Sequence, residues 1–262
     1  PGRMFLVDTA KGRIVGDDEI KDELAAAKPY GHWLRDQVVE LKHLNTPAHE
    51  LGSHSDVLKQ QQTFGYTTEE LKIIIEPMCR DGVEPTGSMG TDTPIAVLSS
   101  RPRLLFDYFQ QLFAQVTNPP LDAIREELVT ALGGTIGPEH NLLNPGPESC
   151  RQIFLEHPVI TNDELSRLVD VQNQPETPDF RSAVISCLYP VADGPAGLRA
   201  ALDHIRAQAS LEIAAGAQIL ILSDRGSTKD LAPIPSLLST SAVHHHLIRE
   251  KNRTRVGLVV ED

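Results

Sequence analysis

The second half of the chain alternates between short apolar runs and longer amphipathic segments, and this alternation limits the possible folds most strongly. The strand-like runs span residues 183–188, 218–222 and 256–260, and the helix-like segments between them span 196–215 and 237–249. Strands that are joined through helices by short connections form parallel βαβ units with right-handed crossovers. The sequence therefore predicts an α/β fold, either an incomplete barrel or an open parallel sheet with helices on its faces.

Charge and composition exclude several classes of protein. The 262 residues carry a formal net charge of -12, and the sequence pI is about 5.3. Proteins that bind nucleic acid gather Lys and Arg on one face, so this balance argues against a nucleic-acid partner. No run approaches about 18 consecutive apolar residues, and residues 1–8 lack the basic start and long apolar stretch of a signal peptide. We therefore expect a cytoplasmic protein with no membrane partner.

Both ends of the chain have the features of cut ends. The chain begins on Pro1 rather than on methionine, and a strand pattern continues to the final residue, Asp262. A parallel strand needs covering elements on both faces of its sheet, so another element normally follows a terminal strand. We expect this chain to be a piece of a longer protein whose last domain is truncated.

The first 28 residues predict a small hairpin followed by a helix. Strands are expected at Met4–Val7 and Arg13–Val15, and a helix is expected at Asp18–Ala27 with Asp17 as its cap. This unit is too small to fold alone. Residues 29–56 are polar and hold scattered histidines and a single tryptophan, which indicates a linker that crosses a surface. The main α/β domain is then expected at residues 57–262.

Further helices are predicted between the linker and the parallel strands. Thr67 and Glu70 match a capping box at the start of an apolar face, so a helix is expected to begin there and to end near Pro77. A short strand is expected at residues 95–98. Amphipathic helices are expected from Pro102 to residue 116 and from residue 121 to residue 132.

The cysteines and histidines do not form a metal-site pattern. Cys79, Cys150 and Cys187 lie tens of residues apart, which fits neither a disulfide framework nor a CxxC motif, so we expect reduced thiols. The consecutive histidines at 244–246 cannot converge on one ion from a helix, because neighbouring side chains point about 100° apart. We predict no metal site in this chain.

One polar turn directly follows a buried strand. Residues 223–227 read SDRGS, and they lie where parallel α/β proteins place their sites, at the carboxyl end of a strand. Two interpretations remain open. Backbone amides with Arg225 and Ser227 could form a pocket for a phosphate or carboxylate, or an ion pair between Asp224 and Arg225 could brace an ordinary turn. The first would make the chain a self-contained α/β enzyme that binds a phosphorylated metabolite at the loops after its strands.

Three segments of the chain resemble a known family. Residues 87–127 read GSMGTDTPIAVLSSRPRLLFDYFQQLFAQVTNPPLDAIREE, a composition that neither helix nor strand propensity explains. With QQQTFGYT at 60–67 and ILILSDR at 219–225, this segment resembles the central domain of the large (alpha) subunit of glutamate synthase. That family comprises iron-sulfur flavoproteins, oxidoreductases of glutamate biosynthesis that convert glutamine, 2-oxoglutarate and a reductant to two glutamates.

The resemblance implies a position between two catalytic domains. Residues 1–28 would be the tail of a glutaminase (amidotransferase) domain, residues 29–56 a linker, and residues 57–262 the central domain. The resemblance implies FMN and an iron-sulfur cluster in the full-length subunit and no cofactor in this segment. It also implies partners, namely the glutaminase and FMN-binding domains of the same chain and the small subunit of the holoenzyme. The sequence leaves NADPH and ferredoxin both open as the reductant, and the resemblance favours NADPH. The segment alone is expected to be inactive because it lacks a catalytic centre.

The resemblance further implies that this domain helps to form an ammonia channel. Ammonia is largely protonated in neutral water, so its transfer between sites needs a route from which water is excluded. Thr117 and Asn118, a hydroxyl and an amide held by the two prolines that follow, are expected to line that route. The alternative is that these two residues only end a helix and that the domain is a spacer. Ser88, Met89 and Asp92 are expected to lie in an interdomain loop near the flavin module.

Overall fold

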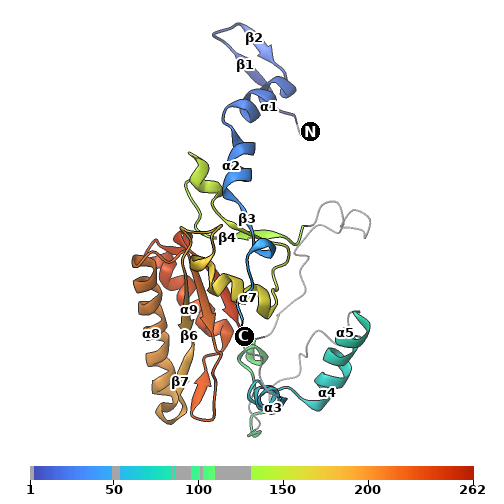
Figure 1. The fold of residues 1–262 in the computed structure, drawn as a ribbon, viewed down its shortest axis with the longest axis vertical. Helices are drawn as coiled ribbons and strands as arrows, with labels where there is room; N and C mark the ends of the chain where they lie inside the picture. The colour runs from blue at the N-terminus through green and yellow to red at the C-terminus, as the bar shows by residue number, and fades with distance from the viewer. Residues whose placement is uncertain (1–2, 49–53, 84, 86–95, 101–102, 110–130) are drawn as a thin grey trace.

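An open parallel sheet forms the centre of the computed structural model, which describes residues 3–48, 54–83, 85, 96–100, 103–109 and 131–262. Its three strands are β6 (Ser182–Ser186), β8 (Ile219–Ser223) and β10 (Gly257–Glu261). They pair in the order β10–β8–β6, and helices α8 (Gly194–Ala214) and α9 (Ser236–Arg249) connect them (Figure 1). The predicted α/β fold with an open parallel sheet is therefore confirmed.

Strand β8 is buried on both faces because its apolar residues alternate between two cores. Leu220 and Leu222 pack with residues of α8 and α9 in one core, and Ile219 and Ile221 belong to the other core with Leu168. Successive side chains on a strand point to opposite faces, so a strand that is covered on both sides needs a continuous apolar run. Each of these side chains contributes about 2 kcal/mol by burial.

The second core is covered by a small mixed sheet and a helix. The sheet has the order β3–β5–β4, in which β3 (Val39–Glu40) is parallel and β4 (Gly134–Ile136) antiparallel to β5 (Ile153–Leu155). Helix α7 (Asn162–Val169) contributes Leu165 and Leu168, and a capping box between Thr161 and Glu164 starts it. The 3₁₀ turns η4 (Pro147–Cys150) and η5 (Val171–Asn173) lie beside these elements. The second core therefore depends on chain segments that precede the parallel sheet.

The segment that was expected to be a linker crossing a surface contains regular elements and core residues. It contains α2 (Tyr30–Gln37), β3 and the 3₁₀ turn η1 (Leu41–His43). Leu41 and Leu44 are only 2% and 3% exposed and pack in the second core. A surface crossing is therefore the wrong description of residues 30–44, because one pair of leucines in a polar stretch is too weak a pattern to indicate burial.

The parallel sheet adjoins a second strand pair through the buried Cys187. The predicted single run at 183–188 is divided, since β6 ends at Ser186 and β7 (Leu188–Pro190) pairs antiparallel with β9 (Leu231–Pro233). The Cys187 amide donates to the Ser223 carbonyl (2.7 Å), and the Cys187 carbonyl accepts from the Ile234 amide (2.8 Å). The short turns η6 (Val191–Asp193) and η7 (Arg253–Arg255) precede α8 and β10.

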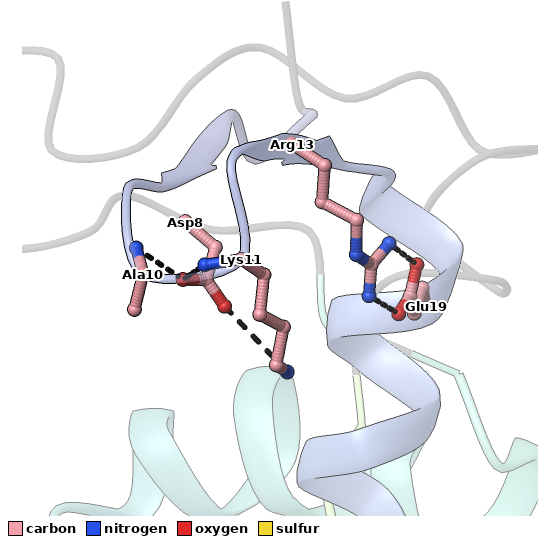
Figure 2. A network of polar contacts seen from close by, with 5 residues as sticks. All are labelled: Asp8, Ala10, Lys11, Arg13 and Glu19. Carbon is pink, nitrogen blue, oxygen red and sulfur yellow. Dashed lines mark hydrogen bonds and ion pairs between the residues drawn. The ribbon is translucent and has the colours of Figure 1, made fainter.

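The predicted hairpin and helix at the start of the chain are present. Strands β1 (Leu6–Asp8) and β2 (Arg13–Val15) pair antiparallel and lead into α1 (Asp17–Ala26). Figure 2 shows how the unit is held together. The Asp8 carboxylate accepts from the amides of Ala10 (3.0 Å) and Lys11 (2.9 Å), and the Arg13 guanidinium makes two hydrogen bonds to the Glu19 carboxylate. These contacts fix the turn and join β2 to α1.

The cap of helix α1 differs from the predicted one. Gly16 is the N-cap, and Asp17 is instead the first residue of the helix. The Asp17 carboxylate accepts from the Met4 amide (2.8 Å) and from the Lys21 ammonium (2.6 Å). A carboxylate in the first turn still favours the helix, because it faces the positive end of the helix dipole.

Residues 54–82 form a chain of short helices, and one predicted boundary within them is wrong. The elements are α3 (His54–Thr63), α4 (Thr68–Glu70), the π-turn η2 (Leu71–Ile75) and α5 (Glu76–Asp81). The predicted capping box is confirmed, with the Glu70 amide donating to Thr67 Oγ1 (3.2 Å) and the Thr67 amide donating to Glu70 Oε2 (2.7 Å). Pro77 does not end the helix. It lies in the first turn of α5, after the wider π-turn, where its missing amide is tolerated.

The described part of residues 96–109 differs from the prediction. Residues 96–98 form no strand but lie in a turn in which the Ser99 amide donates to the Ala96 carbonyl (3.0 Å). Leu105–Tyr108 forms the 3₁₀ turn η3 where an amphipathic α-helix was expected. Residues 131–132 are not helical, and the rest of both predicted helices lies outside the described residues. Within the described ranges, no helix combines the length and the apolar character that crossing a bilayer requires.

Candidate functional site

Polar side chains meet at the carboxyl ends of the parallel strands. Ser186, Ser223 and Glu261 are register partners across the sheet. The Glu261 carboxylate accepts from the Ser223 hydroxyl and forms an ion pair with the Arg225 guanidinium. Arg225 also donates to Oδ1 of Asn162 (3.2 Å), the first residue of α7. These bonds connect β8, β10 and α7, and they close this edge of the sheet around Arg225.

Of the two interpretations of residues 223–227, neither is found as stated. Arg225 does form an ion pair, but its partner is Glu261 on β10 and not Asp224. The side chain of Asp224 is buried at 8% exposure, whereas that of Arg225 is 56% exposed. The cavities described below are lined by other residues. The phosphate-pocket interpretation therefore gains no support.

Asp224 is buried beside two further carboxyl groups, those of the partly buried Glu261 and the exposed Asp262. Burial first, and then the negative charge and hydrogen bond of Asp262 and the charge of Glu261, raise the pKa of Asp224 to about 7. The Ser236 hydroxyl donates to Asp262 (3.0 Å), and this bond holds the second carboxyl in place. Asp224 therefore exchanges its proton near neutral pH, unlike an ordinary surface aspartate.

We expect Asp224 to make the stability of the chain fall as the pH rises. The pKa of Asp224 is raised above its unfolded value of 3.8, so the folded state binds the extra proton between about pH 4 and pH 7, and stability decreases across that window. Asp224→Asn should remove this decrease and raise the free energy of unfolding at pH 8 by about 2 kcal/mol, after allowance for partial solvent screening. Urea unfolding at several pH values measures the effect. The exposed Asp230→Asn is the control, and an unchanged pH slope in Asp224→Asn would contradict the assignment.

The three cysteines are free thiols in separate parts of the chain, as predicted. Cys79 on α5 is exposed, Cys150 in η4 is half-buried, and Cys187 is buried. Burial raises the pKa of the Cys187 thiol to about 11, which makes it a poor metal ligand at neutral pH. Within the described ranges, no three His, Cys, Asp or Glu side chains are arranged to hold a metal ion. The described cysteines therefore do not fit an iron-sulfur cluster, whose ligands are grouped thiolates.

The three consecutive histidines on α9 have different surroundings. His244 Nδ1 accepts from Arg253 Nε (3.0 Å), and His245 is exposed. His246 Nε2 lies 2.9 Å from the Ser210 hydroxyl on α8, which also lies 2.6 Å from Glu250. The carboxylate and the hydroxyl both approach Nε2, at 3.5 and 2.9 Å, whereas a catalytic relay needs them on opposite ring nitrogens. This geometry is structural rather than catalytic.

Two cavities in the described part of the chain are candidate sites, and both are open to solvent. One of about 640 Å³ lies between α8 and α9 and is lined by the Ser210–His246 pair with Arg206 and Glu250. The other, of about 340 Å³, lies between residues 36–39 and residues 176–180, which line it together with Arg151. In that cavity Arg151 forms an ion pair with Asp179 and lies 5.7 Å from the Phe180 ring centroid.

The residues that were predicted to line the channel or the interdomain loop cannot be placed. Thr117, Asn118, Ser88, Met89 and Asp92 all lie outside the described residues. The groups that the structure does bring together at the sheet edge, Glu261 and Asn162, were missed by the sequence analysis. Aligning the ends of the two apolar runs would have found Glu261, because it ends its strand as Ser223 ends β8. No sequence pattern indicated Asn162. It lies at the start of a helix, 63 positions before Arg225, and only the tertiary structure brings the two side chains together.

Comparison with known families identifies residues 59–262 of the chain. The sequence model of the glutamate synthase central domain matches residues 59–262, which include the whole parallel sheet. The chain belongs to the glutamate synthase central domain family. The model of the class-II glutamine amidotransferases matches residues 1–33, which include the hairpin and α1.

Curated relatives of this glutamate synthase central domain are long proteins. The chain is 42% identical over its full length to the glutamate synthase [NADPH] large chain of Bacillus subtilis and covers 16% of that protein. It is 40% identical to the glutamate synthase [NADH] of Schizosaccharomyces pombe, covering 13% of it. It is 42% identical to the ferredoxin-dependent glutamate synthase 2 of Synechocystis, covering 17% of it. The chain thus spans about a sixth of the length of the relatives it matches.

Proposed function

We propose that this chain joins a glutamine-hydrolysing domain to a flavin-dependent synthase domain within a glutamate synthase large subunit. The observation that carries the proposal is the order of the two family matches, with the class-II amidotransferase match at residues 1–33 followed by the central domain match at residues 59–262. The segment acts as an interdomain support and contains no catalytic centre of its own. Residues 1–28 are the amidotransferase tail, 29–56 connect, and 57–262 form the central domain.

The full-length protein would convert glutamine, 2-oxoglutarate and a reductant into two glutamates. FMN and an iron-sulfur cluster, which supply electron transfer when bound, would be held by other parts of that chain, since the described cysteines do not fit a cluster. The small subunit and the FMN-binding domain would be its partners, in the cytoplasm. Relatives named for NADPH, NADH and ferredoxin match about equally well, so the proposal does not specify the reductant.

The central domain would also help to carry ammonia from one site to the other. Neutral ammonia survives transfer only where water is excluded, so the route needs apolar walls with few polar groups. Thr117 and Asn118 supply a hydroxyl and an amide of the kind that suits a constriction. Ser88, Met89 and Asp92 would lie in an interdomain loop near the flavin module.

A self-contained enzyme that binds a phosphorylated metabolite is the weaker alternative. It would need Arg225 to be available to a ligand, yet Arg225 is paired with Glu261 and hydrogen-bonded to Asn162. It would also need Asp224 in an open pocket, whereas that side chain is 8% exposed. These contacts favour an edge that is closed by its own side chains.

An absorbance spectrum tests the proposal. We expect the purified 262-residue chain to leave the flavin bands between about 300 and 550 nm unchanged when FMN is added, because burial of a flavin would perturb them. The full-length chain, expressed in parallel, should be yellow and should form glutamate from glutamine and 2-oxoglutarate. Tight flavin binding by the 262-residue chain would show that this segment contains a redox site and would overturn its role as a support.

A further inference from the structure

Two adjacent leucines lie almost fully in solvent on an ordered turn. Leu142 is 87% exposed and Leu143 is 96% exposed. Asn141 closes the turn, because its Oδ1 accepts from the Leu143 amide (3.0 Å) and its carbonyl accepts from the Asn144 amide (3.2 Å). Single exposed leucines are ordinary, but a pair held forward by a hydrogen-bonded turn is typical of a contact surface. We refer to residues 141–144 as the Leu-Leu turn.

The Leu-Leu turn has a fixed position on the molecule. On one side of it, the Glu139 amide donates to the Thr254 carbonyl (2.7 Å), next to the parallel sheet. On the other side, the Lys28 ammonium donates to the Pro145 carbonyl (2.7 Å). Because the turn is already ordered, binding a partner would cost little conformational entropy. The turn is therefore suited to rigid docking.

The position of the Leu-Leu turn indicates its partner. Lys28 belongs to residues 1–33, which match the class-II amidotransferase family. Helix α2 packs against η4, and Figure 1 shows the loop between β4 and β5 beside α2, between the hairpin and the parallel sheet. The residues that directly follow the turn therefore contact the part of the chain that matches an amidotransferase.

The hairpin and α1 have apolar surface of their own to cover. Phe5, Ile14 and Leu24 are 75%, 64% and 59% exposed. A two-stranded hairpin cannot form a core alone, so these side chains need further elements of an amidotransferase domain to pack against them. A domain that covers the hairpin and continues along α2 reaches the Leu-Leu turn.

We propose that Leu142 and Leu143 dock onto the class-II amidotransferase domain of the full-length chain and fix its orientation on the central domain. The inference rests on the proposed function, because it takes residues 1–33 as part of a working glutaminase. Each leucine would be buried in that contact, and the bond from Lys28 to Pro145 would lie at its edge. The partner is thus a preceding domain of the same chain.

Site-specific photo-crosslinking in the full-length chain tests the contact. With Leu143→p-benzoylphenylalanine, we expect mass spectrometry to find cross-linked peptides from the amidotransferase domain. Val159, which is 85% exposed on the loop before α7, receives the same substitution as a matched control and should not cross-link to that domain. Cross-links from position 143 only to residues 84–130, or to no protein segment, would overturn the proposal.

A second variant tests the functional consequence. We expect Leu142→Asp with Leu143→Asp to lower glutamine-dependent glutamate synthesis by roughly tenfold or more, and to leave ammonia-dependent synthesis within about twofold of the wild type. Leu142→Met with Leu143→Met should restore the rate, because it keeps the apolar volume. An unchanged glutamine-dependent rate in the aspartate variant would overturn the docking role.

The two hypotheses fail in different ways. If the wild-type full-length chain makes no glutamate from glutamine and 2-oxoglutarate, the proposed function is wrong, whatever position 143 cross-links to. If the wild-type chain is active but position 143 does not reach the amidotransferase domain, only the docking of the Leu-Leu turn is wrong.

Discussion

Replacing Ile221 by alanine should lower the free energy of unfolding of the chain by about 4 kcal/mol, because it leaves a cavity at the middle of the sheet. Ile221 has no exposed surface and lies on the central strand, in the core shared with α7 and the β3–β5–β4 sheet. The surrounding side chains come from several elements, so they cannot collapse into the space together. A loss of this size is a large fraction of the stability of a typical domain.

Val184 provides a matched control for that substitution. It is the register partner of Ile221 on β6, on the same face of the sheet, but it is 50% exposed. Val184→Ala should therefore cost about 1 kcal/mol or less, since it removes little buried surface. Urea unfolding followed by far-ultraviolet circular dichroism measures both variants. Equal losses for the two would mean that the second core does not cover β8 as described.

Replacing Thr117 by tryptophan in the full-length enzyme should separate its two activities. If Thr117 lines the ammonia route, a bulky side chain would obstruct it, and glutamine-dependent glutamate synthesis should fall by roughly tenfold or more. Synthesis from added ammonia should stay within about twofold, because ammonia from solution reaches the synthase site without the route. Steady-state rates with each nitrogen donor provide the measurement.

The conservative Thr117→Ser variant is the control for the tryptophan substitution. It keeps the hydroxyl and reduces the volume, so both rates should remain close to those of the wild type. If the tryptophan variant loses both activities equally, Thr117 affects folding or domain packing. If it loses neither, Thr117 does not line the ammonia route, and the central domain acts as a spacer at that point.

The parallel sheet could be predicted because its signals are local. The run Ile219–Leu222 is apolar at every position, which is what a strand covered on both faces requires, and the flanking helices repeat at helical spacing. The capping box at Thr67 is equally local. In each case, neighbouring residues alone decide the backbone conformation.

The errors arose where distant contacts decide the structure. Leu41 and Leu44 are core residues only because β5 and α7 lie against them. Pro77 continues a helical segment because a π-turn precedes it. At the sheet edge, the partner of Arg225 lies 36 positions away, on a strand whose register had to be known first. Local patterns contain no information about such pairings.

The position of Leu41 and Leu44 bears on where this protein can be divided. The family match begins at residue 59, yet the wall of Ile219 and Ile221 is completed by side chains that precede it. The segment that the family model matches therefore begins later in the chain than the segment that builds the core. A chain that is cut at the family boundary would lose Leu41 and Leu44 from the second core and leave a gap in its packing. The segment leading from the amidotransferase region is therefore at once a connection and part of the wall of the domain that it connects.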